Sequence, residues 1–183
     1  MGLSVFWDNS NIWIVGQAVC HKREPGDETA FRIDFGHLLD FAINKRQLDY
    51  AYVSGSIPPN NDPLWKRFEN LGATVETQER GAGSGGEIAV DEVIQLSMAN
   101  RILDAKPGTM VLLTGDGSGY TDGKGFLKQL ERAHNHGWSI EVMSWDAGVN
   151  RYLRQFAEKN GVYRSSKPAY DQVTFINNKR RSR

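Results

Sequence analysis

Residues 110–126, MVLLTGDGSGYTDGKGF, decide how the rest of the chain is interpreted. Four apolar residues, Met110 to Leu113, form an unbroken run, which is typical of a strand covered on both faces of a sheet. The run gives way to a glycine-rich loop that carries Asp116 and Asp122. Because open parallel sheets place their binding crevice at the carboxyl ends of the strands, we expect the functional site at this loop.

Strand-like and helix-like segments alternate along the chain. Strands are expected at 3–7, 49–54, 73–77, 110–113, 138–143 and 173–176, and helices at 33–45, 62–71, 87–103, 124–136 and 149–159. This alternation predicts an α/β fold with a mainly parallel sheet and helices on both faces. Residues 16–32 follow neither pattern, and we expect a long mobile insertion there.

The length and the charge pattern predict one domain and a short tail. With 183 residues the chain can bury a substantial core, and we assign residues 1–176 to a single domain. Residues 177–183 form a basic tail that we expect to be disordered.

The composition excludes several classes of function. Basic and acidic residues number 22 each, so no global field indicates a nucleic-acid partner. The single cysteine, Cys20, excludes an internal disulfide and a cysteine-based zinc site, and it is consistent with a reducing compartment. No stretch has the roughly 20 apolar residues of a membrane-spanning helix, and no signal-peptide pattern is present, so we expect a cytoplasmic location.

Acidic residues gather around the expected crevice. Asp8 ends the first strand as Asp116 ends the strand at 110–113. Glu87 and Asp91 are four residues apart at the start of a long helix and share one of its faces. Clustered carboxylates repel one another unless a cation holds them together, and Mg²⁺ and Mn²⁺ prefer such oxygen ligands. A divalent ion in this place would activate water and neutralise charge during phosphodiester cleavage.

Simpler interpretations exist for the same residues. A single Asp at a strand end is often an N-cap or a turn former, and a carboxylate such as Glu87 stabilises a helix N-terminus by roughly 0.3–1 kcal/mol. The glycines at 81, 83 and 86 match the dinucleotide-binding pattern. A pyrophosphate at that helix start would face Glu87 and Asp91, so we reject a dinucleotide site.

Three short motifs carry a family resemblance: FWDNSN at 6–11, Val90-Asp91 at a helix start, and LTGDGS at 113–118. In this order, and over about residues 3–145, they resemble the motifs of NYN domains, the LabA-like branch of the PIN-like nuclease superfamily. The resemblance implies a three-layer α/β/α sandwich with a Mg²⁺- or Mn²⁺-dependent ribonuclease site. It also implies three catalytic, metal-binding carboxylates, Asp8, Asp91 and Asp116, with the Asn11 amide orienting Asp8 or a substrate phosphate.

Two positions depart from the pattern of that family. Ser118 stands where the third motif has a second Asp, so either metal affinity falls or Asp122 supplies the missing charge. Glu87 stands near the position of a residue that is usually basic, which makes it a candidate additional acid. For contact with substrate we expect Ser118, Trp13 near the mouth of the crevice, and Lys124 at the start of the next helix.

The residues and the resemblance together predict a metal-dependent ribonuclease that acts on single-stranded or structured RNA, with Asp91 orienting the attacking water. Two alternatives stay open. One is an RNA-binding module whose catalysis is weakened by Ser118, and the other is a phosphohydrolase that acts on small nucleotides in the same acidic pocket. The sequence also leaves open whether the chain forms a homo-oligomer.

Overall fold

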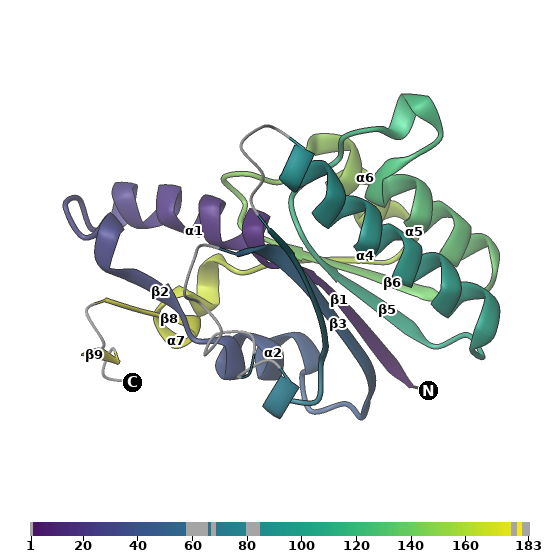
Figure 1. Cartoon of the computed structure of the whole chain (residues 1–183), viewed down its shortest axis with the longest axis horizontal. Helices are drawn as coiled ribbons and strands as arrows, with labels where there is room; N and C mark the ends of the chain where they lie inside the picture. Colours follow the sequence, from purple (N-terminus) through teal and green to yellow (C-terminus); the bar gives the residue numbers. More distant parts are fainter. Residues whose placement is uncertain (1, 58–65, 67–68, 80–84, 177–178, 181–183) are drawn as a thin grey trace.

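The computed structural model describes residues 2–57, 66, 69–79, 85–176 and 179–180. A six-stranded parallel sheet lies at its centre, in the order β4-β3-β1-β5-β6-β7 (Figure 1). The strands are β1 (Leu3–Asp8), β3 (Leu48–Ile57), β4 (Thr74–Glu79), β5 (Thr109–Leu113), β6 (Ser139–Ser144) and β7 (Val162–Ser165). The expected α/β class with a parallel central sheet is confirmed.

Helices cover both faces of this sheet, as a three-layer sandwich requires (Figure 1). One layer consists of α4 (Gly85–Asp104), α5 (Gly125–Asn135) and α6 (Arg151–Asn160). The opposite layer contains α1 (Asn9–Arg23), α2 (Phe35–Ile43) and α7 (Tyr170–Val173). Single 3₁₀ turns occur at Glu28–Ala30, Tyr120–Asp122 and Lys167–Ala169.

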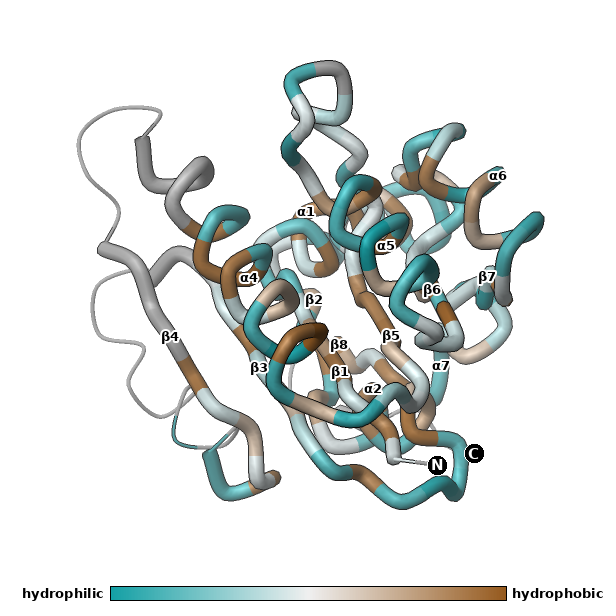
Figure 2. The backbone as a smooth tube through the Cα atoms, turned by 90° about the vertical axis from the view of Figure 1, so that its right-hand side faces the viewer, coloured by the Kyte–Doolittle hydropathy of each residue, from teal (hydrophilic) through white to brown (hydrophobic). Residues whose placement is uncertain are grey.

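The strand pleat divides the hydrophobic residues between two cores. Phe6 packs under α4 and α5, whereas its neighbours Val5 and Trp7 face α1 and α2. The residues of β5 alternate in the same way and are buried on both faces, as their unbroken apolar run predicts. Figure 2 shows the hydrophobic segments concentrated along the central strands behind α4 and α5.

A small antiparallel sheet lies on the side of α1 and α2. Its order is β2 (Phe31–Ile33), β8 (Thr174–Ile176) and β9 (Lys179–Arg180). The strand expected at 173–176 is therefore present, but it pairs with β2 and not with the central sheet. Within the basic tail, β9 pairs with β8, and the other tail residues lie outside the described residues. Most of the helix expected at 62–71 also lies outside them.

The expectation of a mobile insertion at 16–32 is wrong, because α1 occupies residues 9–23. The buried side of α1 is a narrow stripe that includes Ile12, Gly16 and Cys20, and Ile12 is the one large apolar residue among these three, so the stripe gives a weak amphipathic pattern. Gly16 is required by packing: a Cβ there would lie 2.8 Å from the ring of Phe31 and 3.3 Å from Trp145 Nε1. Gly16 thus weakens the apolar pattern of α1 in the sequence but allows the helix to pack closely against Phe31 and Trp145.

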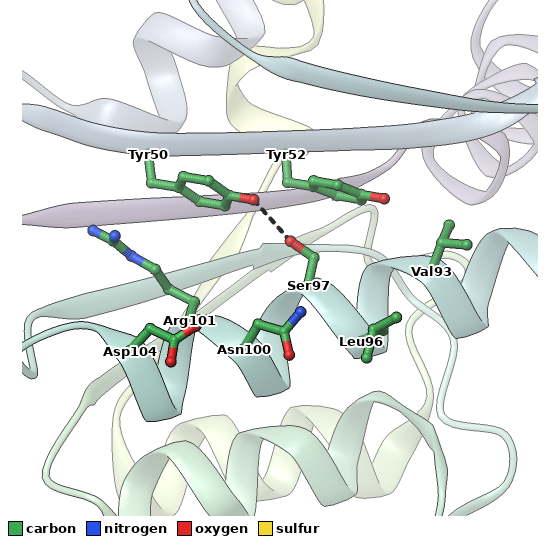
Figure 3. A pocket seen from close by; sticks show the side chains of 8 residues that line it. All are labelled: Tyr50, Tyr52, Val93, Leu96, Ser97, Asn100, Arg101 and Asp104. Atoms are coloured by element: carbon green, nitrogen blue, oxygen red, sulfur yellow. Dashed lines mark hydrogen bonds between the residues drawn. The ribbon is translucent and has the colours of Figure 1, made fainter.

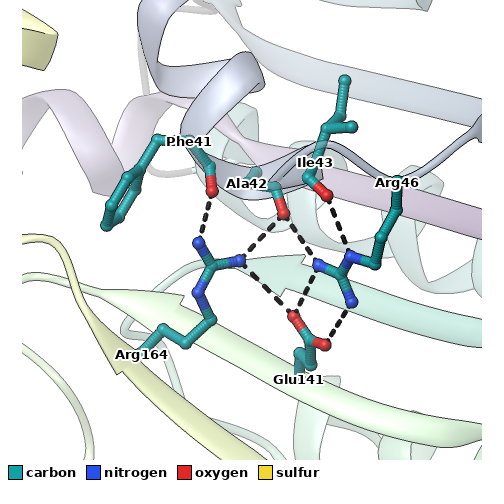
Figure 4. A network of polar contacts seen from close by, with 6 residues as sticks. All are labelled: Phe41, Ala42, Ile43, Arg46, Glu141 and Arg164. Atoms are coloured by element: carbon teal, nitrogen blue, oxygen red, sulfur yellow. Dashed lines mark hydrogen bonds and ion pairs between the residues drawn. The ribbon is translucent and has the colours of Figure 1, made fainter.

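An ionic cluster of Arg46, Glu141 and Arg164 attaches α2 to the sheet (Figure 4). Both oxygens of Glu141, on β6, are contacted by Arg46, and Arg164 Nη1 lies 3.5 Å from Glu141 Oε2. The two guanidinium groups also donate to backbone carbonyls of residues 41–43 in the last turn of α2. These carbonyls lack partners within the helix, so the two guanidinium groups cap the C-terminus of α2. The same two groups also balance the charge of Glu141.

Candidate functional site

The winding of the chain reverses between β1 and β5. From β1 the chain continues to β3 on one side, and from β5 it continues to β6 on the other. The carboxyl ends of β1 and β5 therefore flank a topological switch point, where ligands bind in sheets of this kind. Asp8 is the last residue of β1, and Asp116 follows β5 after Thr114 and Gly115.

Asp8 is buried, with 3% of its surface exposed, and it begins α1 as the N-cap. Its Oδ1 accepts a hydrogen bond from Asn11 N at 3.0 Å, and its Oδ2 accepts one from Thr114 Oγ1 at 2.9 Å. Burial raises the pKa of Asp8 to about 6, the charge of Asp116 acts in the same direction, and the hydrogen bonds oppose both. A cation beside Asp8 would relieve the cost of burial and the repulsion at once.

Thr114 and Asn11 connect the end of β1 to the loop after β5. The Thr114 hydroxyl donates to Asp8 and accepts a hydrogen bond from Asp116 N at 3.2 Å. Asn11 Oδ1 accepts from Gly115 N at 2.7 Å, so Asn11 holds this loop in place. No role is predicted for Thr114 from the sequence, although a hydroxyl residue directly before Gly-Asp at a strand end is the signal that could have identified it.

Asp116 is half-buried and is oriented by Ser118. Asp116 Oδ1 accepts hydrogen bonds from Ser118 N at 3.1 Å and from Ser118 Oγ at 2.6 Å. Ser118 thus supplies donors to the carboxylate at the position where the family pattern has a second acidic residue. These contacts fix the direction of Asp116 relative to Asp8.

Asn150, the N-cap of α6, supports the same loop from the other side and was missed in the sequence. Asn150 N donates to Gly115 O at 2.8 Å, and Asn150 Oδ1 accepts from two backbone amides of α6. A Cβ at Gly117 would lie 2.3 Å from Asn150 Cγ, so only glycine fits between Asp116 and α6. Asn150 lies 34 residues after Asp116 in the chain, and no local sequence pattern links the two.

The other expected site residues lie on different elements around this pair. Asp91 is partly buried on α4, Asp122 is exposed at the end of its 3₁₀ turn, and Lys124 is exposed at the N-cap of α5. Trp13 is half-buried and packs against the core on the side of α1 and α2. Glu87 lies in α4, with its side chain outside the described part of the chain.

Asp8 and Asp116 form an acidic pair whose donor chemistry fits Mg²⁺ or Mn²⁺. Among the described residues, no Lys, Arg or His forms an ion pair with either carboxylate. Within the same residues, no group of three or more His, Cys, Asp or Glu side chains that could hold a metal ion is found. Magnesium often binds through one or two carboxylates, with water and substrate oxygens completing its shell.

The family model of the NYN domain matches residues 2–160. The chain belongs to the NYN domain family. NYN domains are part of the PIN-like nuclease superfamily, whose members generally depend on a divalent metal, and this membership supports a nuclease role. The matched span contains Asp8, Asp91 and Asp116 and ends with α6. A comparison with curated proteins finds no match.

No helix in the described part of the chain has the length and apolar character that crossing a membrane requires.

A separate hollow of about 340 Å³ lies between β3 and α4 of this NYN domain. There Tyr50 and Ser97 share a hydrogen bond of 2.9 Å, and the Arg101 guanidinium lies 5.1 Å from the centre of the Tyr50 ring (Figure 3). Its lining includes neither Asp8 nor Asp116, so it is distinct from the acidic pair.

Proposed function

We propose that this NYN domain is a ribonuclease of the LabA-like branch, dependent on Mg²⁺ or Mn²⁺, that cleaves phosphodiester bonds of RNA. The observation that carries the proposal is the pair of carboxylates at the switch point, where Asp8 is buried and its charge is balanced by no described basic side chain. A metal-dependent nuclease needs such an arrangement, because the negative carboxylates bind the divalent ion, and the ion in turn binds the phosphate of the substrate. The buried lone Cys20 is consistent with action in the cytoplasm.

Each residue has a definite part in this proposal. Asp8 and Asp116 would hold the ion, and Asp91 would orient the attacking water; Asp122 and Glu87 are the further candidates to complete the ligand set. A bound divalent ion supplies a polarised water and neutralises charge that develops on the phosphate. Thr114 and Asn11 keep Asp8 and the loop in place, so the acidic pair needs little rearrangement when RNA arrives.

We expect RNA to contact the groups at the edge of this site. Ser118 and Lys124 are exposed on the loop and at the start of α5, where a phosphate could accept hydrogen bonds or pair with the lysine. Trp13 on α1 is the proposed aromatic contact.

The Asp116→Asn variant tests the proposal. With Mn²⁺ present, we expect cleavage of a labelled RNA oligonucleotide to fall by at least about 100-fold, because the variant removes one charged ligand while keeping the shape of the side chain. The matched control is Asp40→Asn, at an exposed position of α2, which should cleave as the wild type does. Circular dichroism would verify that both variants fold. Unchanged turnover of Asp116→Asn would remove the catalytic claim.

Ser118 favours one second candidate, an RNA-binding module with weakened catalysis. A hydroxyl in place of a second carboxylate leaves less negative charge to bind a metal ion. Such a protein would bind RNA with a marked dependence on salt and would not cleave it when Mn²⁺ is added. Release of inorganic phosphate from mononucleotides, with RNA untouched, would instead indicate the phosphohydrolase.

A further inference from the structure

A hollow of about 530 Å³ opens beside the loop of Asp116, between α5 and α6. Gly117 and Gly119 of the loop form one wall of it, and Gly117 adjoins Asp116 in the chain. Most of its remaining lining is aromatic or aliphatic and consists of Tyr120, Leu127, Tyr152 and Phe156. The volume lies within the range of about 300–1,000 Å³ that small-molecule sites have.

Two tyrosines at this hollow are exposed and are held by polar contacts. Tyr120 is 41% exposed, its hydroxyl donates to Glu131, and Lys128 Nζ lies 5.9 Å from the centre of its ring. Tyr152 is 57% exposed, accepts a hydrogen bond of 2.7 Å from Arg151 and lies 4.7 Å below the Arg151 guanidinium. Exposed rings that are fixed in direction offer flat faces on which nucleobases stack.

The charge around the hollow is suited to a polyanion. Among the described residues, Arg151 forms no ion pair with an acidic group, and Lys124 is exposed on the adjoining loop. The acidic lining residue, Glu131, is balanced by Lys128 at 2.9 Å. Phosphate groups of a nucleic acid would therefore meet positive charge beside the aromatic surface.

We propose that this hollow, the Tyr120–Tyr152 pocket, binds a base of single-stranded RNA next to the nucleotide whose phosphate reaches Asp116, while Arg151 contacts the backbone. A duplex keeps its bases stacked and paired, so it cannot place one in such a pocket. For the proposed ribonuclease, the pocket thus narrows the substrate to RNA that is single-stranded at this position. The position of the cut rests on the proposed ribonuclease function, but the binding of the base does not.

The test measures RNA binding without cleavage. A fluorescein-labelled single-stranded RNA of twelve nucleotides is titrated with the full chain in EDTA, and the dissociation constant is obtained from fluorescence anisotropy. We expect Tyr152→Ala and Tyr120→Ala each to weaken binding about tenfold, the loss typical of one stacked base. Tyr152→Phe keeps the ring and should bind within about twofold of the wild type. Binding of the two alanine variants equal to the wild type would overturn the pocket.

Two additional ligands sharpen the result. Binding of a duplex RNA of the same length should not change in the alanine variants, and an equal loss for duplex and single strand would overturn the stacking assignment. A single-stranded DNA of the same sequence should bind more weakly than the RNA, and equal affinity would overturn the assignment to RNA.

The outcomes also separate the pocket from the ribonuclease proposal. If the wild type binds RNA through the tyrosines but does not cleave it with Mn²⁺, the pocket stands and the ribonuclease proposal fails. If Asp116→Asn abolishes cleavage while Tyr120→Ala and Tyr152→Ala bind normally, the ribonuclease stands and the pocket fails.

Discussion

The Glu141 cluster and the acidic pair are two ways of burying carboxylates in one sheet. Glu141 is 14% exposed and meets two arginines, which also close the end of α2. Asp8 is more deeply buried, and the charge that acts on it comes from a second carboxylate, Asp116. Burying a charge costs free energy unless it is paired. The first site is complete within the chain, whereas the second keeps negative charge that the proposed Mg²⁺ or Mn²⁺ would balance.

This contrast separates stability from function. The arginines around Glu141 are donated by the loop after α2 and by β7, so the pairing joins distant parts of the chain. The contacts of Asp8 come from neutral groups, a backbone amide and a hydroxyl, which orient the carboxylate without cancelling its charge. An acidic group that is held but not neutralised is typical of a ligand site.

The largest effect is expected when the charge of Glu141 is removed. Glu141→Gln leaves two guanidinium groups partly buried without a counter-charge, and we expect the free energy of unfolding to fall by about 3 kcal/mol. The matched control is Glu158→Gln on α6, whose pair with Arg154 is exposed and should contribute less than about 0.5 kcal/mol. Urea denaturation followed by tryptophan fluorescence measures both, and equal losses would show that compensation at Glu141 is unimportant.

Removing the charge of Asp8 should raise the free energy of unfolding, in contrast to removing the charge of Glu141. The pKa of Asp8 is raised to about 6 in the folded protein from its ordinary 3.8, so the folded state binds more protons between these values. The free energy of unfolding of the wild type therefore falls as the pH rises through this window. At pH 7.5 we expect Asp8→Asn to be more stable than the wild type by about 2 kcal/mol, after allowance for weakened hydrogen bonds.

The pH dependence provides the check on Asp8. At about pH 2.5, more than one unit below the ordinary pKa of 3.8, the carboxyl is protonated in both states, so the advantage of Asp8→Asn over the wild type should be lost. Urea denaturation at both pH values in EDTA gives the comparison, with Asp40→Asn as the exposed control. A variant less stable than the wild type at pH 7.5 would mean that the hydrogen bonds to Asp8 outweigh its burial.

A smaller effect is expected when the proposed cation is added. At a Mn²⁺ concentration ten times its dissociation constant, binding to the folded state should stabilise the wild type by about 1.4 kcal/mol, or about 4 °C in Tm. The Tm of Asp116→Asn should rise much less, because this variant has lost one of the two charged ligands of the pair. Differential scanning calorimetry with Mn²⁺ or EDTA measures the shift, and equal shifts in both proteins would place the ion elsewhere.

The sequence predicted those parts of the molecule in which local pattern and tertiary structure agree. The alternation of strand and helix patterns predicted the parallel sheet, the apolar run predicted that β5 is buried on both faces, and the positions of Asp8 and Asp116 at strand ends predicted that the two residues are neighbours. Helix α1 was missed because its buried stripe depends on Gly16, which fits only once Phe31 has packed against it. Strands β2 and β7 have three and four residues, too few to show a pattern.

The remaining site residues depend on contacts that no local pattern contains. Thr114 meets Asp8 across 106 positions in the chain, and Asn150 supports Gly115 from the start of another helix. For Asp91, the sequence indicates which face of α4 it occupies, but not how far that face lies from Asp8. Helical spacing determines orientation around an axis and leaves the placement of the axis to tertiary packing.

The direct passage from β1 into α1 has a consequence for how this scaffold can diversify. Asp8 closes the strand and caps the helix, with no connecting residue between the two elements. A substitution of Asp8 would change the proposed metal ligand and also disturb the start of α1, so few substitutions should be tolerated at this position. New substrate preferences should therefore arise by changes in residues 117–124 and at the start of α6, where insertions and altered side chains leave the first strand untouched.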